Sequence, residues 1–100
     1  MKVLTKGHKY ELSNFESLAG QVLQFIEKEP SSNGDLKTIN DGTTNEEVLK
    51  MLIDRIQYLQ QIVPCRENAI AITNLEQALM WLEKRTSDRK ARKVEGTSNN

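Results

Sequence analysis

The sequence predicts an α+β fold in which a small N-terminal antiparallel β region precedes a long antiparallel α-helical hairpin. The first forty residues are rich in β-branched and aromatic residues, and the spacing of apolar residues changes to three and four after Asn40-Asp41-Gly42. Pro64 then separates two segments that both have this helical spacing. A chain of 100 residues fits a single domain, with residues 1–41 as the β region, 43–93 as the hairpin and 94–100 as a tail.

The β region is expected to be a small antiparallel sheet of two or three strands. Strand-forming runs occupy Lys9 to Phe15, Gln21 to Glu29 and Leu36 to Ile39. A turn at Ser17 to Gly20 separates the first two runs, and the hairpin dipeptide Asn33-Gly34 precedes the third. Because so small a sheet is only marginally stable alone, it needs another surface to pack on.

The segment after Gly42 is expected to form the first helix of the hairpin. Thr43 with Glu46, or Thr44 with Glu47, forms a capping box, and the two glutamates suit the positive end of the helix dipole. The apolar residues of this helix recur at intervals of three and four and form a seam: Leu49, Leu52, Ile56, Leu59 and Val63.

A second helix of similar character follows Pro64, which ends the first helix and can occupy the first turn of the next. The connection is so short that the two helices must be antiparallel neighbours. Ala69-Ile70-Ala71-Ile72 alternates as a strand would, but the helical pattern on both sides outweighs four residues. The seam of the second helix consists of Cys65, Asn68, Ile72, Leu75, Leu79 and Leu82.

The composition excludes several function classes. The formal net charge is zero and Cys65 is the only cysteine, so no internal disulfide forms, which fits a reducing compartment. No run is long and apolar enough for a signal peptide or a membrane span, so a soluble cytoplasmic protein is expected. His8 has no second ligand at metal-binding spacing, and no cofactor is expected. With no phosphate-binding glycine loop and no paired carboxylates, the sequence does not indicate an enzyme.

Both ends of the chain are basic. Residues 1–10 contain three lysines and no acid, and residues 84–100 contain six basic residues and two acidic ones. This distribution suits an anionic ligand, or contact of the ends with the acidic middle of another copy. A solvated helix end favoured by the macrodipole is the plainer explanation. Under the first interpretation, Arg89 and Arg92 are candidate contacts of the anion.

The open end of the hairpin is a candidate anion site. The end of the second helix should lie beside the start of the first, so Arg85 is expected near Thr44 and Asn45, where helix-end amides point outward. Asn68 lies about 25 Å from Arg85 along the same helix, too far for one nucleotide to contact both within a chain. If two hairpins pair head to tail, Tyr58 and Asn68 of the second copy would close over the anion with an aromatic face and an amide.

Structural roles compete with these binding roles. Asn68, a polar residue at a seam position, can instead fix the register of the hairpin. Cys65 fits a small buried apolar role better than a reactive thiolate. Trp81 fits a core or an interface better than ligand stacking.

The block GTTNEEVLKMLIDRIQYLQ, followed by PCRENAIAITNLEQALMWLEKRTSDRKARKVEGT, resembles the bacteriophage anti-Thoeris proteins of the first Thoeris anti-defence type. The upstream YELSNF and GQVLQFIEKEP resemble the N-terminal strands of that family, so the resemblance runs from about Tyr10 to Thr97. The most specific segments are PCRENAIAIT and LEQALMWLEKRT. The second of these is also similar to the hairpin of related phage proteins that capture cyclic oligonucleotides of the CBASS defence system.

The resemblance implies a sponge. Family members bind glycocyclic ADP-ribose, the cyclic ADP-ribose isomer that Thoeris TIR enzymes make during infection, and they do not cleave it. They assemble as dimers or as hexamers of dimers and bind the ligand at the dimer interface, and some take up CBASS cyclic nucleotides at separate sites. The positions that match the family's pocket are Tyr58, Asn68 and Arg85, although many relatives are expected to carry another aromatic residue at the first.

Two other function classes stay open. A small nucleic-acid-binding regulator would use the basic end of the second helix and would bind with a steep salt dependence, although the scattered acids oppose this interpretation. A purely structural or protein-inhibiting hairpin would leave Arg85 solvated, and no nucleotide would then raise its thermal midpoint. The preferred cyclic isomer, the choice between dimer and hexamer, and the roles of the β region and the tail are left open as well.

Overall fold

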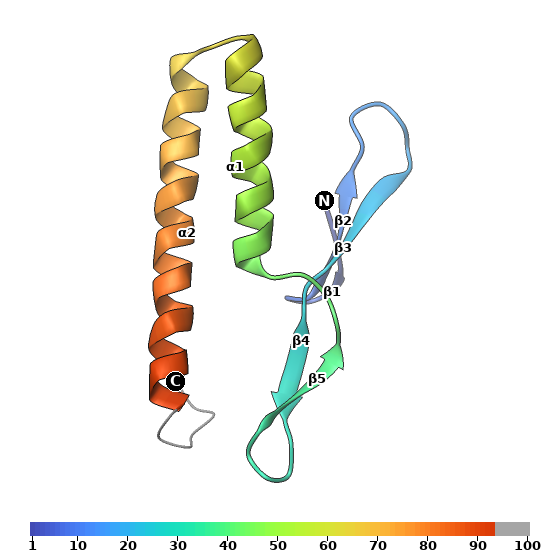
Figure 1. Cartoon of the computed structure of the whole chain (residues 1–100). Coiled ribbons are helices and arrows are strands. Elements are labelled where there is room, and N and C mark those ends of the chain that lie inside the picture. The colour runs from blue at the N-terminus through green and yellow to red at the C-terminus, as the bar shows by residue number, and fades with distance from the viewer. Residues whose placement is uncertain (94–100) are drawn as a thin grey trace. The chain divides into compact units, whose positions relative to one another are not determined.

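The computed structural model describes residues 1–93, which form short strands followed by two long helices (Figure 1). This order confirms the predicted α+β fold. The contacts divide the chain into two units, Met1–Thr44 and a second unit that begins at Asn45 and holds both helices. The description of residues 1–100 as one domain stays a prediction, and the predicted tail at 94–100 lies outside the described residues.

The first unit contains five strands in two antiparallel sheets, where the sequence predicted one sheet of two or three strands. Strand β1 (Lys2–Thr5), which the sequence did not predict, has only four residues and pairs with β2 (Lys9–Ser13), with Lys2 opposite Glu11. Strand β2 also pairs with β3 (Gly20–Gln24), from Lys9↔Gln24 to Ser13↔Gly20. The first sheet has the order β1 (Lys2–Thr5), β2 (Lys9–Ser13), β3 (Gly20–Gln24), and the second pairs β4 (Glu27–Pro30) with β5 (Leu36–Asn40).

The predicted strand from Gln21 to Glu29 is wrong as a single strand, because the backbone changes its partner at Phe25 and Ile26. Strand β3 ends at Gln24. The Ile26 N–H then donates to the Thr43 carbonyl oxygen at 2.9 Å, and the Thr43 N–H donates to the Gln24 carbonyl oxygen at 2.9 Å. The segment before the helices therefore pairs with the middle of the predicted strand and divides it between two sheets.

Gly42 permits this close approach. A Cβ atom at Gly42 would overlap the carbonyl oxygen of Gln24 and would lie 2.7 Å from the carbonyl carbon of Phe25, so a larger residue would push the two backbones apart. The Phe25 ring also meets the Tyr10 ring edge to face, with ring centroids 5.9 Å apart. Gly42 is thus needed for packing within the first unit, as well as for the break before the helices.

The second unit is the predicted helical hairpin. Helix α1 (Asn45–Ile62) and helix α2 (Arg66–Lys93) lie side by side and antiparallel (Figure 1). Helix α1 begins at Asn45, which agrees with the predicted alternative in which Thr44 is the capping residue, and Glu46 and Glu47 occupy its first turn. None of the helices within residues 1–93 is both long enough and apolar enough to cross a membrane.

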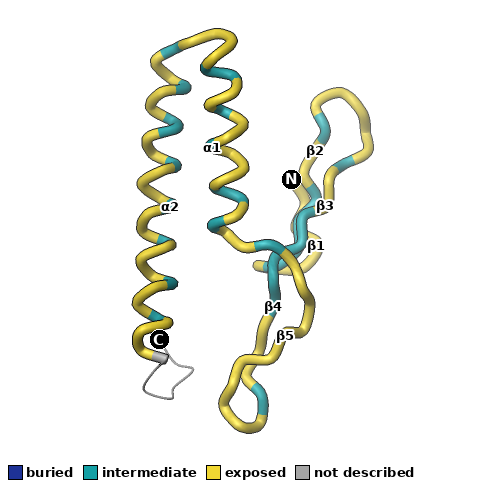
Figure 2. The backbone as a smooth tube through the Cα atoms, in the orientation of Figure 1, coloured by how far each residue is buried: buried dark blue, intermediate teal, exposed yellow. Residues whose placement is uncertain are grey.

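No described side chain is fully buried, and the helices share only a half-buried inner strip (Figure 2). The seam predicted for α2 is confirmed, because all six of its residues are half-buried. The seam predicted for α1 is wrong at Leu52, which is 37% exposed, and at Val63, which is 68% exposed and follows the last residue of α1. Ile53 takes the inner position instead of Leu52. Because Leu52 and Ile53 are both apolar and adjacent in the sequence, the apolar spacing alone does not distinguish which of them faces α2.

Candidate ligand-binding site

A hydrogen bond between two side chains fixes the register of the two helices at the open end of the hairpin. The Thr86 hydroxyl donates to Oε2 of Glu46 at 2.8 Å. This bond joins the last turns of α2 to the first turn of α1, as an antiparallel hairpin requires. It therefore brings the stretch that contains Arg85 to the level of Asn45, which begins α1. Thr44 is the last residue of the first unit.

The predicted arginines of α2 are positioned differently from one another. Arg85 and Arg92 are exposed, whereas Arg89 is half-buried on the face that also carries Thr86. Asn45 is exposed at the start of α1. The exposed guanidinium groups and the amides of the first turn of α1 are the groups at this end that suit an anion.

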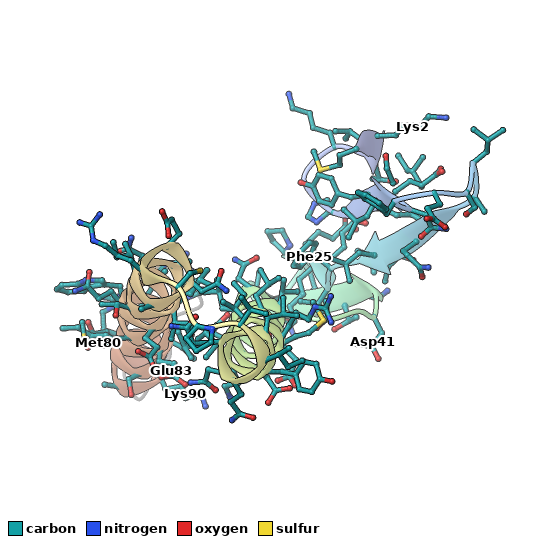
Figure 3. The ribbon with its side chains drawn as sticks, turned by 90° about the horizontal axis from the view of Figure 1, so that it is seen from above. Lys2, Phe25, Asp41, Met80, Glu83 and Lys90 are labelled. Atoms are coloured by element: carbon teal, nitrogen blue, oxygen red, sulfur yellow. The ribbon has the colours of Figure 1, made fainter. Side chains whose placement is uncertain are left out.

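A shallow depression follows the exposed face of α2 at this end. Its volume is about 230 Å³, and its lining residues are Trp81, Lys84, Arg85, Asp88 and Arg92. Trp81 is 62% exposed, and the Met80 side chain beside it points away from α1 (Figure 3). Sites that enclose a ligand of drug size usually measure about 300–1,000 Å³. This surface would therefore need a second surface over it to enclose a ligand of that size.

The charges within the depression are not equivalent. Lys84 Nζ lies 2.9 Å from Oδ2 of Asp88 and forms an ion pair with it. The hydrogen bond from Lys84 lowers the pKa of Asp88 below its ordinary value, and the positive charges of Lys84 and Arg92 lower this pKa further. Asp88 is thus ionised at neutral pH and largely offsets the charge of Lys84. Arg85 has no ion-pair partner among residues 1–93, so its charge remains available to an anion.

Replacing Lys84 with methionine is expected to raise the pKa of Asp88 toward its ordinary value. The change removes the hydrogen bond and the nearest positive charge, whereas Arg92→Gln removes only a weaker attraction and should raise this pKa less. In the wild type the lowered pKa of Asp88 stabilises the fold at pH values above the ordinary aspartate pKa. This stabilisation is lost as the pH falls through the lowered pKa. An NMR titration of the Asp88 carboxyl carbon in the three proteins measures both shifts. Equal titration of wild type and Lys84→Met would contradict the ion pair.

Tyr58 and Asn68 lie toward the turn of the hairpin and differ in exposure. Tyr58 is 57% exposed, on the α1 face that also carries the exposed Met51 and Ile62. Asn68 is half-buried in the inner strip, and its backbone N–H donates to the Sγ atom of Cys65 at 3.4 Å. Asn68 remains about 25 Å along α2 from Arg85. A single chain therefore does not bring the residues of the two ends together.

Sequence reasoning missed three residues of the depression, namely Trp81, Lys84 and Asp88. Trp81 was interpreted as a core or interface residue, but its 62% exposure places it outside the core of the hairpin. The available signal was the helical spacing of Trp81, Arg85, Asp88 and Arg92, at intervals of four, three and four, which places them on one face.

The chain matches a known protein family and is similar to a known phage protein. The family model described as the Acb2/Tad1 hairpin domain matches residues 23–87. A protein of Bacillus phage SBSphiJ7 named Thoeris anti-defense 1 is 57% identical over 58 residues, which cover 57% of this chain and 41% of the phage protein. The chain thus spans about two-fifths of the length of the curated relative that it matches. The family match includes Tyr58, Asn68 and Arg85, and it ends before Arg89 and Arg92.

Proposed function

The chain belongs to the Acb2/Tad1 hairpin-domain family, which includes anti-Thoeris sponges, and from this premise we propose that it is a phage anti-defence sponge. It binds and sequesters glycocyclic ADP-ribose, the signal made by Thoeris TIR enzymes, in the cytoplasm of the infected cell and does not cleave it. The observation that carries the proposal is the 57% identity to Thoeris anti-defense 1 over 58 residues.

The chemistry of the hairpin ends supports this ligand class. A cyclised ADP-ribose presents a pyrophosphate, two riboses and a purine. Arg85 and Arg92 supply cations for the pyrophosphate, Tyr58 supplies an aromatic face for the purine, and Asn68 supplies an amide for its edge. Nanomolar capture corresponds to about 12 kcal/mol. Two or three charge-assisted hydrogen bonds of about 1.5–3 kcal/mol each, with stacking and burial, reach that range without any reaction of the ligand.

A homodimer gives these groups a common site. The depression beside Arg85 is shallow, and the groups at the turn lie about 25 Å away along the helix. In a head-to-tail pair, Tyr58 and Asn68 of one copy cover Arg85 of the other, and the two-fold symmetry produces two such sites. Association also covers apolar side chains that one chain leaves exposed, including Met51, Ile62 and Trp81. Growth of the dimer to a hexamer is the further assembly implied by the resemblance.

The direct test is a capture and release experiment. Purified protein is incubated with glycocyclic ADP-ribose and filtered, and the retained fraction is heated to release the ligand for mass spectrometry. We expect the ligand to disappear from the filtrate and to be recovered intact. Recovery of a cleaved product would show an enzyme, and a ligand that remained in the filtrate would reject Thoeris signalling as the target.

A second candidate function is capture of CBASS cyclic oligonucleotides, which the likeness of LEQALMWLEKRT to the related phage hairpins favours. The same filtration assay with a cyclic trinucleotide tests it. If the two ligands occupy separate sites, saturation with the cyclic trinucleotide leaves capture of glycocyclic ADP-ribose unchanged. A nucleic-acid-binding regulator would instead retain duplex DNA or RNA, with an affinity that falls steeply as salt is added.

A further inference from the structure

The turn of the hairpin is closed by the side chain of one residue, Gln60. Its Nε2 atom donates to the carbonyl oxygen of Cys65 at 3.0 Å, and its Oε1 atom accepts from the N–H of Cys65 at 3.0 Å. The carboxamide thus pairs with both backbone groups of one residue across the turn. Both residues are half-buried, so these bonds are partly shielded from water.

Cys65 transmits this restraint to the first turn of α2. Its Sγ atom accepts a hydrogen bond from the Asn68 N–H at 3.4 Å, and its carbonyl oxygen accepts one from the Ala69 N–H at 3.3 Å. Cys65 therefore occupies the capping position of α2, and Asn68 lies three residues beyond it. Gln60 of α1 thus holds the capping residue of α2, and the position of this cap sets how α2 is rotated about its own axis.

We propose that Gln60 is a positioning residue for ligand capture, because it holds the Cys65 cap and thereby sets the direction of the Asn68 amide. This inference rests on the proposed function, in which Asn68 contacts the ligand. A helix turns by about 100° per residue, so a cap displaced by one residue would rotate Asn68 away from its site. Other side chains could allow a turn here, but only a group with one donor and one acceptor matches both backbone groups of Cys65.

The Gln60→Glu variant tests this role with almost no change of shape. An ionised carboxylate still accepts from the Cys65 N–H, but it has no proton for the Cys65 carbonyl oxygen and repels it. A protonated carboxyl again offers one donor and one acceptor. We therefore expect Gln60→Glu to bind glycocyclic ADP-ribose about tenfold more weakly than wild type at pH 7.5. The deficit should disappear as the pH falls through the pKa of the new carboxyl group.

The matched control is Gln61→Glu. Gln61 is the next residue of α1, is exposed, and would carry the same added charge. The ionisable residues just after the turn are the same in both variants, namely Cys65, Arg66 and Glu67. The ratio of the affinities of Gln60→Glu and Gln61→Glu at each pH therefore isolates the effect of position 60. A second variant, Gln60→Met, forms neither bond and should bind weakly at every pH. Circular dichroism at each pH confirms that the compared proteins have equal helix content.

The outcomes separate this inference from the proposed function. If wild type does not retain glycocyclic ADP-ribose, the proposed function and the inference both fail. If wild type binds and Gln60→Glu follows the same pH profile as Gln61→Glu, the inference alone fails. Full binding by Asn68→Ala would also overturn it, since there would be no amide to position. A deficit specific to Gln60→Glu that disappears on acidification supports it.

Discussion

Replacing Arg85 or Asn68 with alanine is expected to weaken capture of glycocyclic ADP-ribose by about a hundredfold or more while the hairpin stays folded. Arg85 is exposed beside Trp81, and its charge is not paired with another residue among 1–93. Loss of one or more charge-assisted bonds to the pyrophosphate accounts for this factor. Loss of the Asn68 amide leaves polar atoms of the ligand without partners inside the site.

Each variant has a matched control on the same helix. Lys90→Ala removes an exposed cation of α2 that does not line the depression, so its effect on capture should be much smaller than that of Arg85→Ala. Asn74→Ala removes an exposed amide and should bind as wild type does. Filtration or calorimetric titration measures the affinities. Full-strength binding by both Arg85→Ala and Asn68→Ala would show that the ligand binds elsewhere, even if the protein is a sponge.

Mixing the two defective proteins tests whether a pocket combines groups from two copies. In a head-to-tail dimer, one pocket of a mixed dimer receives both intact residues and the other receives neither. After subunit exchange of equal amounts, about a quarter of the wild-type capacity should return, since half of the dimers are mixed and each keeps one of two pockets. If Arg85 and Asn68 acted within one chain, mixing would restore nothing.

The helical hairpin was predictable because its signals are local and repeated. The spacing of Ile72, Leu75 and Leu79 extends over several turns, and Pro64 marks the connection. The antiparallel arrangement then follows from the short turn, and the Thr86–Glu46 bond agrees with it. At Leu52 and Ile53 the pattern was ambiguous, because packing against α2 selects one of two adjacent apolar residues.

The division of the β region could not be predicted in the same way. Gln24 and Ile26 exchange hydrogen bonds with Thr43, almost twenty residues further along the chain, and no local pattern at Phe25 indicates this partner. The extended character of the segment was visible in its composition, but its pairing depends on a long-range contact. Gly42 was recognisable as a break and not as the point where two backbones meet.

The candidate site shows the same distinction between local and long-range signals. Arg85 and Asn45 were expected at one end of the hairpin because antiparallel geometry alone places them there. Trp81 lies outside the predicted seam of α2, so its exposure also followed from the local spacing, although its aromatic character favoured a core or interface role. Gln60 was not singled out, because its contacts with Cys65 cross a turn and form only in its folded geometry.

Substitution of Ile72 with aspartate is expected to destabilise the hairpin strongly, whereas the same substitution at Ile70 is expected to change its stability little. Ile72 lies half-buried in the inner strip, while Ile70 is 43% exposed on the same helix. Truncation of a core isoleucine costs about 2–5 kcal/mol, so we expect a loss of about 2–4 kcal/mol at this half-buried position, including the cost of placing a carboxylate there. A surface change such as Ile70→Asp should stay within about 0.5 kcal/mol.

These two substitutions also distinguish a helical from a strand conformation at Ala69-Ile70-Ala71-Ile72. In a strand, residues 70 and 72 would share one face and their substitutions would have similar effects. In a helix they lie about 200° apart, so only one of them faces α1. Urea denaturation followed by circular dichroism gives the free energy of unfolding for each variant. Equal losses for the two variants at dilutions where the protein is monomeric would contradict the helical packing. Equal losses only at high concentration would instead show that a second copy covers Ile70.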